Sequence, residues 1–173
     1  RGLKPILLER DDYGGATTWN SLRIVHGGLQ YLQTLDLTRF RESVNERHWF
    51  LRHFPDLVEP LDCLMPLYGR GLRRPWVLRA VLVMNDFLSR HRNEGIRADR
   101  VLPGGRVLDA QETISVFPAV DREELRGAAL WYDAVMPNSQ RLVIELLHWA
   151  CCCGARCLNY MEVTDLAVRK YRV

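Results

Sequence analysis

Ile6-Leu7-Leu8-Glu9-Arg10 is a short apolar stretch that ends in an acid, and a polar, glycine-containing run leads from it to His26-Gly27-Gly28. A short apolar run bounded by turn residues predicts a buried strand of a parallel sheet over residues 4–9. Dinucleotide-binding folds use a carboxylate in this position to hold a ribose hydroxyl. A charged residue at the end of a strand is also ordinary, so Glu9 by itself does not decide between the two interpretations.

The residues that would complete a dinucleotide site belong before this strand. The glycine-rich turn that cradles the pyrophosphate normally precedes the acid by about 20 residues. The sequence starts at Arg1, without an initiator methionine. We therefore expect the chain to be an internal part of a longer fold, to bind such a cofactor weakly or not at all when isolated, and to be inactive alone.

Four small polar residues after the strand can donate hydrogen bonds to phosphate oxygens. They are Thr17, Thr18, Asn20 and Ser21. The same residue types cap helices, and both roles are compatible because a helix N-terminus itself attracts anions. Gly27 and Gly28 then interrupt an apolar helical pattern, where each glycine costs about 1 kcal/mol relative to alanine. We expect them to permit the close approach of a ligand or of another backbone.

Composition narrows the class of protein. The chain has 173 residues, 47% of them hydrophobic and 26% charged, with a net charge of +3. These values are typical of a folded domain, and no basic stripe indicates nucleic-acid binding. Five cysteines, an odd number, favour a reducing cytoplasm over a disulfide framework. No signal peptide is visible, and no apolar run is long enough to span a bilayer.

Hydrophobic periodicity and turn residues predict an α/β fold of mixed character, with an inserted α+β portion. Turns are expected over residues 10–20 and in the polar, irregular stretch 91–107. Strands are expected over 4–9, 59–68, 126–133 and 156–163, with a further strand opening in 165–173. Helices are expected within 20–33, from 37 until Pro55, and over 75–90, 109–117 and 138–153. Asp109 and Glu112 have the spacing of a capping box.

Several segments together resemble the FAD-dependent glycerol-3-phosphate dehydrogenase family, within the superfamily of D-amino-acid-oxidase and glutathione-reductase-like flavoproteins. The most specific is Arg23-Ile24-Val25-His26-Gly27-Gly28-Leu29-Gln30-Tyr31-Leu32. The supporting segments cover residues 7–10, 17–21, 41–47, 65–68, 130–133 and 154–164. The likeness therefore extends over nearly the whole chain.

The resemblance implies a partial Rossmann-like FAD-binding domain interleaved with part of a substrate domain. We expect residues 1–58 and 136–173 to belong to the FAD-binding portion and residues 59–135 to the substrate-domain insertion. It also implies that the flavin of the complete protein accepts a hydride from a small hydroxylated substrate. A quinone or oxygen is then the expected electron acceptor, and the oligomeric state is left open.

The family pattern implies a role for each cofactor residue. Glu9, with Arg10 beside it, would hold the adenosine ribose, and residues 17–21 would follow the pyrophosphate and the flavin. His26-Gly27-Gly28 would pack near the isoalloxazine ring, and the backbone of Val163 would meet the adenine.

Gln30 and Tyr31 occupy the expected substrate positions, but Gln30 stands where the family usually has arginine. This replacement weakens the case for a phosphorylated substrate, because arginine suits bidentate phosphate binding. His26 is the one candidate for a catalytic base. Two alternatives stay open: an FAD-dependent amino-acid or hydroxy-acid oxidase of the same superfamily, and a non-catalytic module that has lost the flavin.

The cysteines and one apolar helix give weaker indications of function. The cysteines at 151, 152, 153 and 157 lack metal-ligand spacing, so we expect small packing residues on a buried helix and no metal site. The apolar helix over 75–90 has arginines at its ends, namely Arg70, Arg73, Arg74, Arg90 and Arg92. Such a helix can lie on a membrane surface, although packing on a sheet explains it as well. We expect a cytoplasmic location, with attachment to a membrane surface as the alternative.

Overall fold

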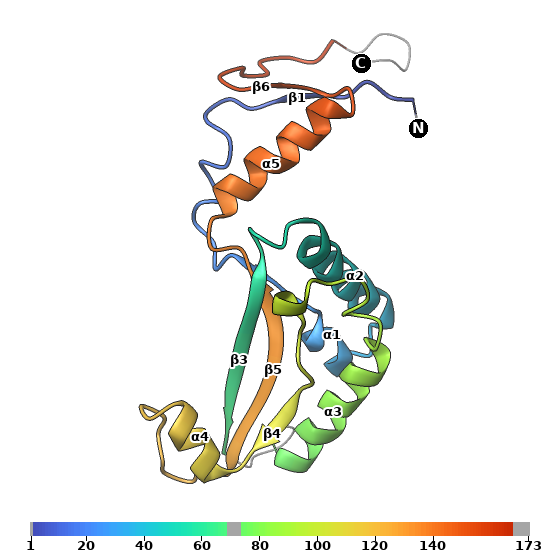
Figure 1. Cartoon of the computed structure of the whole chain (residues 1–173). Coiled ribbons are helices and arrows are strands. Elements are labelled where there is room, and N and C mark those ends of the chain that lie inside the picture. The colour runs from blue at the N-terminus through green and yellow to red at the C-terminus, as the bar shows by residue number, and fades with distance from the viewer. Residues whose placement is uncertain (1, 69–73, 168–173) are drawn as a thin grey trace. The chain divides into compact units, whose positions relative to one another are not determined.

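The computed structural model describes residues 2–68 and 74–167, which form two compact units (Figure 1). Unit 1 comprises Arg1–Arg23 and Pro137–Val173, and unit 2 comprises Ile24–Met136. Packing therefore divides the chain at 23/24 and 136/137. The division into cofactor and substrate segments at 58/59 and 135/136 stays a prediction.

Unit 1 contains a two-stranded parallel sheet and one long helix. Strand β1 (Ile6–Leu8) pairs with β6 (Arg156–Leu158), with Leu7 opposite Cys157. Helix α5 (Ser139–Cys152) begins at Asn138, whose side chain accepts a hydrogen bond from the Arg141 amide at 2.9 Å. Between β1 and unit 2 the chain runs through turns over residues 10–20, as predicted.

Three strand predictions in unit 1 need correction. Strand β1 is parallel but not buried, since Ile6, Leu7 and Leu8 are 60%, 44% and 44% exposed. The reason is that β6 is its only partner among the described residues, and a two-stranded sheet leaves much of its surface uncovered. Strand β6 is shorter than expected because Tyr160 turns the chain with a φ of +56°. Residues 165–167 form no strand, and 168–173 lie outside the described residues.

Unit 2 is built on an antiparallel sheet around β5 (Gly127–Val135). Strand β3 (Glu59–Leu67) pairs with β5 over its whole length, while β2 (Ile24–Val25) and β4 (Arg106–Leu108) pair with its two ends. Gly127 has a φ of +139°, and a Cβ there would lie 2.1 Å from the carbonyl oxygen of Leu108. No other residue fits this start of β5.

Helices cover this sheet and supply the core of unit 2 (Figure 1). They are α1 (Leu29–Gln33), α2 (Leu37–His53), α3 (Pro75–Leu88) and α4 (Ala110–Val116), with a 3₁₀ turn at Ala98–Arg100. The capping box of Asp109 and Glu112 is confirmed at the start of α4. Leu67, Leu78 and Leu82 pack with Ala129 in the centre, and none of the four is more than 7% exposed.

The helix expected within 20–33 is reduced to its last five residues. Gly28 has a φ of +79° and begins α1, so the apolar residues before it are free to join the sheet as β2. The expectation of buried cysteines on α5 is also wrong, because Cys151, Cys152 and Cys153 are exposed at the end of that helix. Among the described residues, no helix is long and apolar enough to cross a membrane.

Candidate functional site

Asp133 on β5 is the centre of a buried polar cluster in unit 2. One carboxylate oxygen, Oδ1, accepts hydrogen bonds from the Gly27 amide at 2.7 Å and from Arg47 Nη1 at 2.8 Å. The other, Oδ2, lies 3.2 Å from Nδ1 of His26. Asp133 is only 4% exposed, and a buried carboxylate is tolerated because a guanidinium and two further groups surround it. The cluster therefore fixes the segment around His26 against β5.

Arg47 comes to this cluster from α2 and is itself 3% exposed. Its Nη1 also donates to the Tyr132 carbonyl at 2.8 Å, while its buried Nε has no hydrogen-bond partner in the described part of the chain. Burial lowers the pKa of the Arg47 guanidinium, and the charge of Asp133 opposes that effect. Helix α2 thus contributes a positive charge directly beneath the His-Gly-Gly segment.

The two glycines of this segment are needed by the protein itself. A Cβ on Gly27 would lie 1.8 Å from Nη1 of Arg47, and a Cβ on Gly28 would lie 2.9 Å from that of Ser43. The close approach expected for these glycines is therefore made at least by α2. A contact with a flavin ring stays a prediction.

A pocket of about 290 Å³ opens beside this cluster. It brings together three of the residues predicted for the site, His26, Gly28 and Gln30, with Asp133 and with Trp131 of β5. Because alternate residues of a strand share one face, β3 and β5 present Cys63, Met65, Trp131 and Asp133 to the same side. Tyr31 is not among the lining residues and packs against the cluster of Leu32, Phe40 and Val44.

Within this pocket, His26 is the group best placed to move a proton. Its contact with Asp133 engages Nδ1 and so leaves Nε2 for a ligand. The His26 side chain is 62% exposed, whereas that of Asp133 is 6% exposed. This arrangement of an exposed imidazole held by a buried carboxylate is the one that orients general bases in enzymes.

Cys63 also lines the pocket, and sequence analysis did not predict a role for it. Burial, together with the negative charge of Asp133, raises the pKa of its thiol to about 11. The thiol is therefore neutral near physiological pH and is not suited to be a nucleophile.

Alkylation of Cys63 is expected to be slow near neutral pH, because a pKa of about 11 leaves only about one thiol in a thousand ionised at a pH three units lower. Labelling by iodoacetamide, followed by peptide mass spectrometry, should accelerate about tenfold per pH unit on approaching that value. The exposed Cys152 serves as the internal reference. Equal labelling of the two thiols near neutral pH would contradict the assignment.

The predicted ribose acid, Glu9, lies in unit 1 directly after β1. Its amide donates to the Leu158 carbonyl at 2.9 Å, and its Oε1 accepts a hydrogen bond from the Asp11 amide at 3.0 Å. No partner for Oε2 occurs among the residues that the structure describes. A carboxylate held by one oxygen and open at the other can accept hydrogen bonds from ribose hydroxyls.

The turn segment of unit 1 contains a shallow hollow of about 590 Å³. Its lining includes Thr17 and Asn20, both predicted to bind the cofactor, together with Gly15, Ala16 and Trp19. Thr18 contributes differently, since its carbonyl accepts hydrogen bonds from Ser139 Oγ at 2.8 Å and from Ser21 Oγ at 3.4 Å. These contacts fix the turn and leave Thr17 and Asn20 at its surface.

The positions of the other predicted cofactor residues, Arg10 and Val163, give no indication of a binding site. Arg10 pairs with Asp11 at 3.0 Å on the surface, and Val163 is 54% exposed. The described residues contain no group of three or more side chains that could hold a metal ion. Sequence analysis missed Arg47 and Asp133, although both lie in segments that resemble the family, because neither stands beside His26 in the sequence.

Comparison with known proteins places the chain in a family. All of residues 1–173 match the family model described as FAD dependent oxidoreductase. A glycerol-3-phosphate dehydrogenase of Synechocystis is 36% identical over 96% of this chain and 29% of its own length. The human mitochondrial glycerol-3-phosphate dehydrogenase is 30% identical over 96% of the chain and 22% of its own length. The chain thus spans about a quarter of the length of such relatives.

Solved structures support the same fold. The glycerol-3-phosphate dehydrogenase of Bacillus halodurans, complexed with FAD, has a TM-score of 0.60 at 19% identity, over 98% of this chain and 24% of that one. L-alpha-glycerophosphate oxidase of Mycoplasma pneumoniae, with FAD bound, has a TM-score of 0.60 at 15% identity, over 92% of this chain and 39% of that one. From the full-length family match and these sequence relatives, we conclude that the chain belongs to the FAD-dependent oxidoreductase family.

Proposed function

We propose that the protein carrying this chain oxidises a small hydroxylated substrate of the glycerol 3-phosphate kind, with FAD as the hydride acceptor. The observation that carries the proposal is the pocket of unit 2, where His26, held by Asp133, and Gln30 line one hollow. The relatives that the chain matches are glycerol-3-phosphate dehydrogenases, which supports the same reaction class.

The residues of unit 1 fit the cofactor that the family requires. The free Oε2 of Glu9 suits a ribose hydroxyl, and the exposed side chains of Thr17 and Asn20 suit phosphate oxygens. We assign Arg10, Thr18, Ser21 and Val163 to the same cofactor segment on the basis of the family pattern. When bound, FAD supplies the electron acceptor that the protein side chains lack.

The residues of unit 2 perform the proton chemistry. His26 takes the proton of the substrate hydroxyl at Nε2 as the carbon loses its hydride. Asp133 holds Nδ1 of the same ring and stabilises the imidazolium that forms, and Arg47 neutralises Asp133. Gln30 offers an amide donor and acceptor to a hydroxyl or carbonyl, whereas the substrate role of Tyr31 rests on the family pattern alone.

The colour and reactivity of the full-length protein test this function. We expect a yellow protein whose flavin absorbance is bleached without oxygen by glycerol 3-phosphate or glycerol, with weaker effects from hydroxy acids and amines. Bleaching by amino acids alone would favour an amino-acid oxidase. A colourless protein that takes up no FAD would overturn the proposal in favour of a non-catalytic module. Oxygen consumption compared with quinone reduction then identifies the acceptor.

We also propose a cytoplasmic location with a peripheral membrane contact, and the exposed face of α3 supports the contact. Its outer face carries three large apolar side chains, and Trp76, Val83 and Phe87 are 68%, 64% and 66% exposed. Arg90 stacks on Phe87 with 5.6 Å from its Cζ to the ring centroid, so a cation borders this apolar face, as in helices that lie on membrane surfaces. Arg70 and Arg73 lie outside the described residues.

Replacement of Trp76 and Phe87 by serine is expected to lower binding of the full-length protein to anionic vesicles by about tenfold, because two aromatic anchors are lost. Co-sedimentation with phosphatidylglycerol vesicles measures the effect. Phe117→Ser, on another exposed aromatic residue, is the matched control. Unchanged sedimentation of the double variant would show that α3 is covered by protein instead.

A further inference from the structure

A second pocket of unit 2, of about 350 Å³, lies between α2 and the turn that follows α3. It shares no lining residue with the pocket of His26, and the proposed oxidation does not use it. Its volume lies within the range of pockets that bind small molecules, about 300–1,000 Å³. We call it the α2 pocket, after the residues that this helix contributes to its lining, namely Phe40, Arg41, Val44, Asn45 and His48.

The floor of the α2 pocket is apolar and is held in place by the core. Phe40 and Val44 are 1% and 8% exposed and pack with Leu32 of α1. Leu88, the last residue of α3, packs against the same cluster. Because a close-packed interior resists rearrangement, this floor keeps its shape. An apolar group placed on it leaves water, which is favourable.

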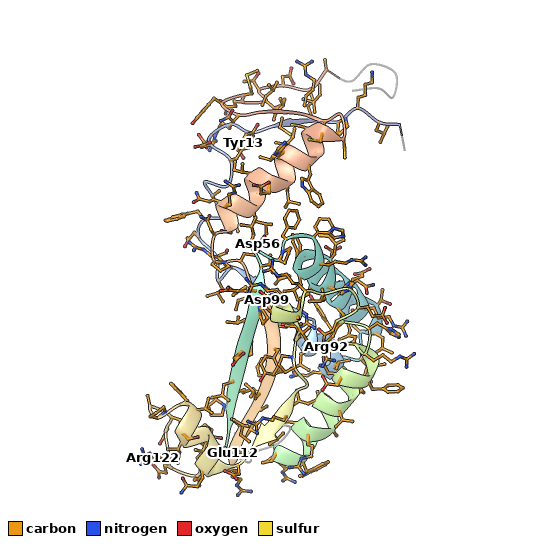
Figure 2. The ribbon with its side chains drawn as sticks, viewed as in Figure 1. Tyr13, Asp56, Arg92, Asp99, Glu112 and Arg122 are labelled. Atoms are coloured by element: carbon orange, nitrogen blue, oxygen red, sulfur yellow. The ribbon has the colours of Figure 1, made fainter. Side chains whose placement is uncertain are left out.

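The turn after α3 forms the opposite wall, and side-chain hydrogen bonds fix it. His48 Nε2 donates to the Glu94 carbonyl at 2.7 Å. Arg92, labelled in Figure 2, donates from Nη1 to Ser89 Oγ at 3.1 Å and from Nη2 to the Pro103 carbonyl at 3.2 Å. The pocket is therefore formed before a ligand enters it, which lowers the entropy cost of binding.

One positive charge at the rim of the α2 pocket has no counter-charge. Arg92 is paired with Asp86, whose Oδ1 lies 3.3 Å from its Nη1, and Glu94 is paired with His91. The Arg41 guanidinium has no hydrogen bond or ion pair within residues 2–68 and 74–167. The rim therefore favours an anion, because an ionised acceptor forms the strongest hydrogen bonds with a guanidinium.

Arg41 and Asn45 present adjacent donors on one face of α2. Residues three and four apart on a helix are neighbours, so the spacing of Arg41, Asn45 and His48 follows this face over two turns. The Asn45 amide likewise makes no hydrogen bond in the part of the chain that the structure describes. A guanidinium binds a carboxylate through two parallel N–H···O bonds, and the neighbouring amide supplies a further donor.

We propose that the α2 pocket binds a small monocarboxylate with an apolar body, of the arylalkanoate kind. The carboxylate pairs with Arg41 and Asn45, and the apolar body rests on Phe40 and Val44. A monoanion matches the single uncompensated cation. A phosphate dianion fits less well, because its second charge is unmatched and the Glu94 carboxylate lines the same pocket.

Binding of para-fluorohydrocinnamate to the full-length protein tests this proposal. The fluorine NMR signal of this probe broadens on binding, and a titration gives the dissociation constant. We expect a Kd of about 1 mM, ordinary for a ligand of this size. The matched amide, para-fluorohydrocinnamamide, has the same body without the charge and should bind about tenfold more weakly or worse.

Variants locate the probe in the α2 pocket. Arg41→Met should weaken binding by about tenfold and Asn45→Ala by about threefold, and both positions are exposed, so both variants keep the fold. Arg39→Met removes an exposed cation of the same helix that does not line the pocket, and should leave the Kd unchanged. His26→Gln should also leave the Kd unchanged, so this site and the proposed oxidation are tested separately.

Several results would overturn the proposal. No binding below about 10 mM, equal affinity in Arg41→Met and the unsubstituted protein, an equal loss in Arg39→Met, or equal binding of the amide would each do so. Loss of binding in His26→Gln would place the probe in the other pocket. Displacement of the probe by inorganic phosphate as readily as by fluorine-free hydrocinnamate would overturn the choice of a carboxylate.

Discussion

Arg47→Met is expected to lower the free energy of unfolding by about 3–5 kcal/mol, the usual cost of removing one partner of a buried ion pair. The change leaves the Asp133 carboxylate 4% exposed with the Gly27 amide and His26 as its remaining partners. Denaturant titration of the full-length protein, followed by tryptophan fluorescence, measures the loss. Arg41→Met, on the same helix but at an exposed position, is the matched control and should change stability by less than about 0.5 kcal/mol.

Gly27→Ala tests the Arg47–Asp133 ion pair by displacing the guanidinium instead of removing it. The new Cβ would lie 1.8 Å from Nη1 of Arg47, so the guanidinium must leave Asp133 for the methyl group to fit. In the Arg47→Met background the same substitution should cost much less, and this coupling is what a double-mutant cycle reports. Additive effects would mean that Gly27 and Arg47 act independently. The cost of Gly27→Ala in the Arg47→Met background is itself the control for the general cost of adding a methyl group at this position.

The second large effect is expected on catalysis. His26→Gln in the full-length enzyme should lower kcat by about 10²- to 10⁴-fold, the range for loss of a general base. The rate is expressed per bound flavin, because His26 lines the pocket of unit 2 and is also predicted to pack near the isoalloxazine ring. Anaerobic stopped-flow reduction of the flavin isolates the chemical step from reoxidation.

The pH dependence separates this role from a structural one. The acidic limb of the pH profile of kcat reports deprotonation of an essential base, and it should disappear in His26→Gln. His48→Gln changes a histidine of unit 2 whose Nε2 lies 2.7 Å from the Glu94 carbonyl, away from this pocket, and should keep the normal profile. A His26→Gln enzyme with kcat within twofold of the unsubstituted one would contradict the assignment.

Local patterns were sufficient to predict most elements of unit 2. The apolar run before Asp133 and the spacing of Phe40, Val44 and Leu51 reflect a buried strand and a helix face that pack in the core. The capping box at Asp109 is likewise a local contact, made between residues three positions apart.

Features that depend on distant parts of the chain were harder to predict. The segment before Gly28 reads as helical, but it pairs with β5 more than a hundred residues later, and this partner decides its conformation. Strand β1 is apolar enough to be buried, yet its burial depends on what covers the sheet. For the same reason the sequence suggested His26 and Gln30 as site residues but not the cluster of Arg47 and Asp133 that fixes His26.

The pairing of β2 with the last residues of β5 has a consequence for how this fold tolerates change. Ile24 lies opposite Val135, so the chain enters unit 2 and leaves it at neighbouring points. A segment whose two ends are adjacent can be removed, or exchanged between relatives, without a linker to span the gap. Inserted domains commonly have this property. Residues 24–136 therefore have the chain geometry of a transferable unit, whose replacement requires two neighbouring junctions only.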